Sequence, residues 1–227
     1  MSLYLILNLA SISIPFLYSF NKKMNYIKWW KQVFLSIFIV AFLFIVWDII
    51  FTRNGVWGFN NSYLTGLYIF NLPIEEWLFF ICIPYASIFI HYAFQHFFPN
   101  IRLSVLSTRT ITIALILLIS AILILNLDKA YTFYNYGFLL LILVFCLFTK
   151  NKELEVFYLT FLIILIPFFI VNGILTGSFI PNEVVWYNDL ENLGIRIGTI
   201  PIEDIGYAFN MLFLNILLIE KFKSTVK

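Results

Sequence analysis

The chain has 227 residues, of which 62% are hydrophobic and only 11% are charged. Soluble globular domains are roughly 45–50% apolar and about 25% charged, so this composition excludes an ordinary water-soluble domain. The formal net charge is +2, which gives no indication of nucleic-acid binding. The composition indicates a protein that is surrounded largely by lipid.

Seven apolar runs are each long enough to cross a bilayer as an α-helix, which needs about 20 residues. They cover residues 3–20, 33–50, 74–96, 107–126, 131–149, 155–172 and 201–221. The runs are continuous rather than alternating, which favours helices over the strands of a membrane barrel. The first run has no basic leader and no small-residue cleavage site, so we interpret it as a retained span. The prediction is an all-α integral membrane protein with seven transmembrane helices.

The basic residues predict how these helices are oriented. If the N-terminus lies outside, only Arg53, Lys129 and Arg196 of the 14 Lys and Arg residues fall outside. The other eleven fall inside: Lys22, Lys23, Lys28, Lys31, Arg102, Arg109, Lys150, Lys152, Lys221, Lys223 and Lys227. Short cytoplasmic loops are enriched in Lys and Arg. We therefore predict a multi-pass protein of the cell membrane with its N-terminus outside and its C-terminus inside.

Two long loops, residues 51–73 and 173–200, each lead into a helix that opens with the same short sequence. The first motif is Pro73-Ile74-Glu75-Glu76, and the second motif is Pro201-Ile202-Glu203-Asp204. A glycine stands seven residues before each proline, at Gly66 and Gly194, and the match between them contains no gap.

The correspondence extends further upstream and indicates an internal repeat. Trp57 corresponds to Trp186, and Asp48, near the end of the second span, corresponds to Asn172 in the sixth. We predict two three-helix repeats, residues 1–97 and 131–227, joined by a connecting helix within 98–130. That single helix restores the direction of the chain, so the two repeats are parallel.

The four acids of the two motifs, Glu75, Glu76, Glu203 and Asp204, are the candidate catalytic residues. Ionisable groups at membrane depth are costly and by default indicate a functional site. We expect each proline at the first helical position, with both acids in the first turn. Acids there can simply complement the helix dipole, but this explains one pair better than a repeated motif. Paired carboxyls, one protonated and one ionised, are suited to general acid–base chemistry, and the sequence leaves the individual roles open.

Helical spacing adds further candidates. Tyr207 and Asn210 follow Glu203 by four and seven residues, so they share its face, which we expect to point into the bundle together with Asn215. Asp48 either joins the acids or is an interfacial charge beside Arg53. The histidines His91 and His96, near the inner end of their span, are predicted to be interfacial rather than catalytic.

Aromatic residues make up 20% of the chain, and most are expected in the membrane core or its interfacial belt. Four that lie near the acids are candidates for stabilising a carbocation by cation–π attraction: Trp57, Trp77, Trp186 and Tyr207.

Several motifs are absent from the sequence. It contains no GxGxxG, GxxxxGK[ST] or HExxH, and no Asp-rich diphosphate motif, so we predict neither a cofactor nor a metal. Cys82 and Cys146 stand alone in apolar runs and are expected to be small core residues. Seven helices are also typical of retinal proteins, which need a lysine within the last helix to bind retinal. Lys221 and Lys223 lie only at or beyond the inner end of the last span, so the sequence argues against a retinal protein.

The duplicated motif, with Trp and Asn in the long loop before it, resembles the integral-membrane lycopene cyclases of carotenoid biosynthesis. The chain looks like the fused, two-domain form, and the resemblance covers essentially all of it. The first motif resembles the signature of the first domain, and the second motif, continued by Gly206-Tyr207, resembles that of the second. The second half has Asp204 where the first has Glu76, and Asn172 where the first has Asp48. These differences suggest that the two halves have different roles.

The resemblance implies a lycopene β-cyclase, classed as an intramolecular lyase or isomerase, that needs no cofactor. A linear end of lycopene is protonated, closes to a six-membered ring and loses a proton, giving γ-carotene or β-carotene. By the resemblance, the four motif acids donate and abstract these protons. The implied partners are lycopene or a related carotenoid and the membrane lipid, and association with other carotenoid-synthesis enzymes is also compatible with the resemblance.

Other functions also fit the sequence. A cyclase that makes a different ring type, or acts on a longer carotenoid, would have the same motifs. A membrane transporter or channel could use paired carboxylates as a proton relay, although the acids lie toward one face rather than at the bilayer midplane. For a non-catalytic assembly subunit the sequence offers no specific feature. Whether the two motifs build one site or two stays open.

Overall fold

The computed structural model describes residues 2–225, which form seven α-helices. The helices are α1 (Leu3–Tyr18), α2 (Trp30–Arg53), α3 (Ile74–Phe97), α4 (Val105–Leu125), α5 (Ala130–Thr149), α6 (Leu154–Leu175) and α7 (Glu203–Thr225). The seven predicted helices are therefore confirmed within the described residues, with ends that differ by a few positions. Lys227, which was counted among the inside charges, lies outside them.

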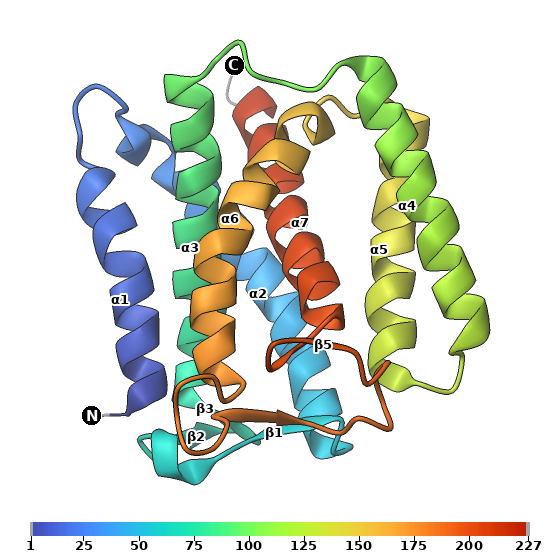
Figure 1. The fold of residues 1–227 in the computed structure, drawn as a ribbon. Coiled ribbons are helices and arrows are strands. Elements are labelled where there is room, and N and C mark those ends of the chain that lie inside the picture. The colour runs from blue at the N-terminus through green and yellow to red at the C-terminus, as the bar shows by residue number, and fades with distance from the viewer. Residues whose placement is uncertain (1, 226–227) are drawn as a thin grey trace.

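Six of these helices, α2 to α7, are long and apolar enough to cross a membrane. Helix α1 has only 16 residues, which corresponds to about 24 Å at 1.5 Å per residue and is less than the roughly 30 Å of a bilayer core. The helices alternate in direction, so α1–α3 run the same way as α5–α7 (Figure 1). The orientation in the membrane and the division into repeats at residues 97 and 130 stay predictions.

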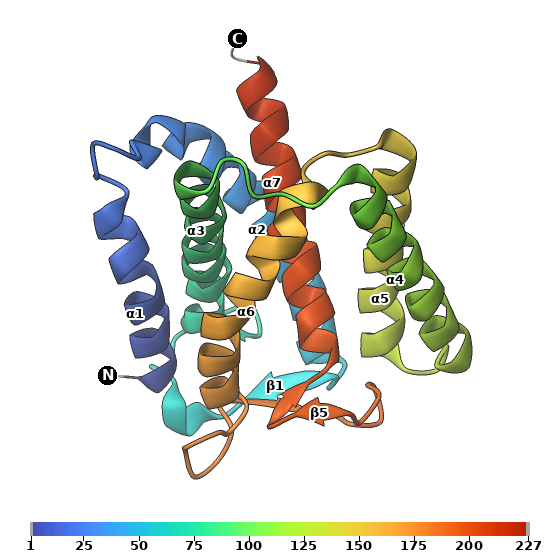
Figure 2. The ribbon, with the colours of Figure 1, turned by 45° about the horizontal axis from the view of Figure 1, so that its top comes forward.

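The described residues also form six short strands, and the labelled strands β1 and β5 lie at one end of the bundle (Figure 2). Strand β1 (Trp57–Phe59) pairs antiparallel with β4 (Val185–Tyr187), so the two long loops are joined by backbone hydrogen bonds. Two hairpins complete this end: β2 (Tyr68–Ile69) with β3 (Leu72–Pro73), and β5 (Arg196–Ile197) with β6 (Ile200–Pro201). The all-α prediction missed these strands because two or three residues are too few to show an alternating pattern.

The expected position of the motif prolines is wrong. Pro73 ends β3 and caps α3 from outside, and Pro201 ends β6, two residues before α7 begins. Each proline pairs across its hairpin, with Tyr68 and Arg196 respectively. The acids nevertheless lie in the first turn of α3 and α7, as predicted.

The first helix of each half packs on the third helix of the same half. Helix α1 packs on α3, and α5 packs on α7, while α2 on α7 and α3 on α6 join the halves. Helix α4 packs on the outside of α5, away from α1 (Figure 1). Short 3-10 helices at Tyr26–Trp29 and Asn61–Tyr63 lie in the connections. The starts of α3 and α7, which carry the acids, thus meet at the end of the bundle where the strands lie.

The contact between α5 and α7 depends on a glycine. Gly206 lies on α7, about half a turn beyond Asp204. A Cβ atom at this position would lie 2.9 Å from Cε1 of Tyr136 on α5. Tyr136 is buried, so its ring has little room to move aside. Gly137, in the middle of α5, has no neighbouring atom within 4 Å of the equivalent position.

We therefore expect Gly206→Ala to destabilise the protein by about 1–3 kcal/mol through overpacking. Gly137→Ala, the matched control, should leave stability unchanged or slightly higher, because Ala favours helix over Gly by up to about 1 kcal/mol. Thermal unfolding of the detergent-solubilised protein measures both. Equal melting temperatures for the two variants would contradict the close approach of α5 and α7.

Candidate active site

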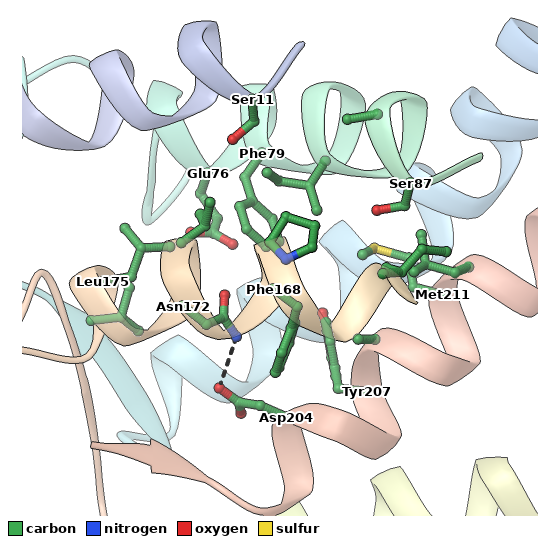
Figure 3. A pocket seen from close by; sticks show the side chains of 18 of the residues that line it. Ser11, Glu76, Phe79, Ser87, Phe168, Asn172, Leu175, Asp204, Tyr207 and Met211 are labelled. Carbon is green, nitrogen blue, oxygen red and sulfur yellow. Dashed lines mark hydrogen bonds between the residues drawn. The ribbon is translucent and has the colours of Figure 1, made fainter. Parts of the chain in front are cut away.

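A cavity of about 370 Å³ lies among α1, α3, α6 and α7, beneath β1 and β4. Three carboxyl side chains line it, those of Asp48, Glu76 and Asp204. Almost all other lining groups are apolar or aromatic, which is typical of a site for a hydrophobic small molecule. Figure 3 views this cavity from close by, with Glu76 and Asp204 turned toward its interior. The two motifs therefore contribute to one cavity.

The two acids of each motif point in different directions. The second acids, Glu76 and Asp204, line the cavity, whereas the first acids, Glu75 and Glu203, do not. Successive residues of an α-helix are about 100° apart, so neighbouring acids in one turn cannot share a face. All four side chains are buried.

Glu75 ties α3 to α1 and to the loop before the first motif. Its Oε1 accepts hydrogen bonds from Ser2 Oγ at 2.7 Å and from the backbone N–H of Thr65 at 2.6 Å. The Asn8 side chain donates to the Glu75 backbone carbonyl at 2.8 Å. Glu75 therefore holds the start of α3 in place rather than facing the cavity.

Glu203 makes the same connections in the second half. Its Oε1 accepts from Thr132 Oγ1 at 2.7 Å and from the backbone N–H of Leu193 at 2.7 Å. Asn135 donates to the Glu203 carbonyl at 2.6 Å, as Asn8 does to that of Glu75. Asn210, a sequence candidate, donates to Oδ1 of Asn135 at 3.0 Å and does not line the cavity.

Hydrogen bonding distinguishes the two cavity acids of the motifs. Glu76 accepts one hydrogen bond, from the hydroxyl of Tyr4 at 2.5 Å. Asp204 accepts three among the described residues, from Tyr131 at 2.6 Å, Tyr187 at 3.0 Å and Asn172 at 3.3 Å. Figure 3 shows the bond from Asn172. Donors of this kind stabilise the ionised carboxylate over the neutral acid. Asp204 is therefore the better stabilised anion of the two.

Asp48 is the third carboxyl group at the cavity. Its Oδ1 accepts from Trp57 Nε1 and from Thr52 Oγ1, the latter at 3.2 Å, and its Oδ2 has no hydrogen-bond partner among residues 2–225. The side chain is buried, more than a turn before α2 ends at Arg53. The sequence left open whether Asp48 joins the motif acids or is an interfacial charge beside Arg53. Its burial favours the first alternative, and it shares the cavity with Glu76 rather than with Glu75.

Three tyrosines that contact the cavity acids were not among the residues predicted from the sequence. Tyr4, Tyr131 and Tyr187 come from α1, α5 and β4, and each donates to a cavity carboxylate. Burial and then the neighbouring Asp204 carboxylate raise the pKa of Tyr187 well above its ordinary value, so its hydroxyl stays protonated and donates a hydrogen bond to Asp204. The signal in the sequence was a tyrosine near the start of each repeat, visible only after the halves are aligned.

The predicted aromatic candidates divide into two groups. Trp57 and Tyr207 line the cavity. The centroid of the Tyr207 ring lies 5.0 Å from that of Phe44 and 5.4 Å from that of Trp47. Trp77 and Trp186 are not part of its wall: Trp77 stacks on Phe70, and Trp186 is 39% exposed and covers Gly58.

The remaining polar predictions have mixed outcomes. Asn210 and Asn215 are buried, as expected for a stripe that faces the interior, and Asn215 Oδ1 accepts from Ser36 at 2.7 Å. The ring of His91 is buried between α3 and α6, with Nδ1 2.7 Å from Thr160 Oγ1, and its interfacial depth in the membrane stays a prediction. His96 is exposed. Within the described residues, no three His, Cys, Asp or Glu side chains form a metal-binding group.

Comparison with known proteins connects this geometry to a family. The family model described as "Lycopene cyclase" matches residues 1–94 and 128–222, which together are most of the chain. Each matched stretch contains one of the two motifs. No curated protein and no solved structure matches the chain in the corresponding searches.

The roles of the first acids lead to a stability prediction. Glu75→Ala removes the acceptor of one buried and one partly buried hydrogen bond, and a hydrogen bond to a charged group is worth about 1.5–3 kcal/mol. We expect its melting temperature to fall by roughly 5 °C or more, and the same for Glu203→Ala. Limited proteolysis should then cut near Thr65 or Leu193, whose amides lose their partner. Glu183→Ala, at an exposed loop glutamate, is the control, and an equally large fall there would refute the tethering role.

Proposed function

Because the chain belongs to the lycopene cyclase family, we propose that it is a multi-pass membrane lycopene β-cyclase that closes linear ends of lycopene into β-ionone rings. Family membership implies a carotenoid cyclase. The observation that carries the finer proposal is the apolar cavity to which each motif contributes one carboxyl group, Glu76 and Asp204.

The reaction needs an acid, a base and a dry pocket. A proton adds to the terminal double bond of the linear end and leaves a cation on the adjacent tertiary carbon. The electrons of a second double bond then form the ring bond and move the positive charge into the ring. Loss of a proton from a carbon next to the cation, to a carboxylate, restores a double bond. Loss from one or the other neighbouring ring carbon gives the β or the ε ring, and loss from the attached methyl group gives the γ ring. One proton is gained and one lost, so the product is an isomer of the substrate.

The hydrogen bonds support a division of roles between the cavity acids. Glu76, with a single donor, is the proposed proton donor. Asp204, with three donors, is the proposed base, because those donors hold it in the ionised form. Asp48 shares the cavity with them, and its Oδ2, which has no hydrogen-bond partner among residues 2–225, is a second proton acceptor there.

The rings around the acids suit a cationic intermediate. Trp57 and Tyr207 line the cavity, and the negative face of an aromatic ring attracts a cation within about 6 Å. The apolar wall also excludes water, which would otherwise capture the cation as an alcohol. Glu75 and Glu203 are proposed as positioning residues that set the direction of Glu76 and Asp204.

The proposal predicts different effects for the two acids of each motif. In a bacterium that accumulates lycopene, the wild-type chain should produce cyclic carotenoids. Glu76→Gln and Asp204→Asn should lower ring formation by about 100-fold or more, the scale of lost acid–base catalysis. Glu75→Gln and Glu203→Gln are the matched controls. They should change it by about fivefold or less, because Gln keeps an oxygen that accepts the loop amide. Pigment analysis, normalised to protein in the membrane, measures all five.

Two results would contradict these assignments. Unchanged lycopene with wild-type protein present in the membrane would refute the cyclase itself. Normal cyclisation by Glu76→Gln together with loss in Glu75→Gln would show that the cavity is not the place of reaction.

A second prediction follows from the proton balance of the reaction. Membranes containing the enzyme, supplied with lycopene in D2O, should give products that carry one solvent deuteron for each ring formed. Mass spectrometry of the purified carotenoids measures this, and a parallel reaction in H2O should show no change of mass. Rings that contain no deuterium would exclude protonation by an exchangeable carboxyl group.

A further inference from the structure

The cavity continues well beyond the acids. On α3 its lining runs from Glu76 to Ile90, which corresponds to about 21 Å at 1.5 Å per residue. Helix α1 contributes small side chains there, Ala10 and Ser11, and α6 contributes Pro167. We call the part of the cavity beyond the acids, between α1 and α6, the lateral groove.

The lateral groove opens on the outer surface of the bundle. Ile14 lines it and yet is 66% exposed, and Ala10 and Pro167 are also exposed. Helices α1 and α6 each pack on α3, and they flank it on either side (Figure 1). In a membrane-spanning bundle that surface faces lipid, so the carboxyl groups are connected to the bilayer through an apolar path.

In the second half an aromatic side chain occupies the place that is equivalent to this opening. The hydrogen bonds of Tyr4 and Asn8 correspond to those of Tyr131 and Asn135. The same spacing places Phe138 where the first half has Ser11. Phe138 fills this place, and the centroid of its ring lies 6.2 Å from that of Phe44 and 6.3 Å from that of Trp47. The two halves thus differ at this place, where the first half has a small residue beside the groove and the second has Phe138 packed among other aromatic rings.

We propose that the unreacted polyene chain of the substrate lies in the lateral groove and leaves the protein between α1 and α6 into the lipid, so that the enzyme holds one end at a time. This inference rests on the proposed function and adds the path of the substrate and the order of ring closure. A carotenoid with one ring must leave through the groove, reverse and return before its other end can react.

Ser11→Phe tests the path, because it introduces the side chain that occupies the equivalent place in the other half. Ser11 lies seven residues beyond Tyr4 on α1, so it is about 10 Å past the acids. We expect Ser11→Phe to reduce ring formation from lycopene by about tenfold or more, through blocked binding. The matched control is Ser13→Phe, which is exposed and does not line the cavity, and it should behave as wild type.

A shortened substrate separates a blocked groove from a damaged protein. A polyene that bears the same linear end but stops short of Ser11 should be cyclised by Ser11→Phe at nearly the wild-type rate. Loss of activity on both substrates would place the effect at the acids or in folding, and would overturn the inference. Normal activity on lycopene would do the same.

The order of ring closure gives an independent readout. With wild-type enzyme the one-ring carotenoid should appear free before the two-ring product and then decline. Two-ring product without a free one-ring stage would overturn the claim that one end is held at a time. Wild-type enzyme that leaves lycopene unchanged would instead refute the proposed function, so the two failures are distinguishable.

Discussion

The site depends on the hydrogen bonds that Glu75 and Glu203 accept from the backbone amides of Thr65 and Leu193. Each bond joins the start of a motif helix to the long loop before it and fixes the rotation of the first turn. The next residue then points about 100° away, into the cavity. A buried acceptor without its donor is costly, so this rotation is strongly determined. The pairing of β1 with β4 brings the two loops, and with them the two second acids, to one place.

A duplicated frame here carries a single, asymmetric site. Asp204 accepts three hydrogen bonds and Glu76 accepts one, although both occupy the same position in their motifs. Asn172 stands where the first half has Asp48, and it donates to Asp204 where another acid would repel it. Such differences allow one carboxyl group to give a proton and the other to take it. The two motifs are thus similar in the bonds that position them and different in the hydrogen bonds that their second acids accept.

The sequence predicts the helices well because an apolar run of this length has few alternatives in a bilayer. It also identifies the motif acids, since charge is rare among so many apolar residues. It does not separate Glu75 from Glu76, because the direction of an acid depends on how the preceding loop reaches the helix. The roles of Tyr4 and Tyr131 were harder to find, because tyrosine is common in this chain and these two stand out only as equivalent positions near the start of each repeat. Asn8 and Asn135, polar residues inside apolar runs, were a usable signal that the sequence analysis overlooked.

The central claim is that one chain builds one site from both motifs. Co-expression of a Glu76→Gln chain with an Asp204→Asn chain, in cells that accumulate lycopene, tests it most directly. Every molecule then lacks one of the two carboxyl groups, so the account predicts that lycopene persists as it does with either variant alone. Restored ring formation would show that the motifs act in separate sites or are shared between chains, and would contradict the single cavity.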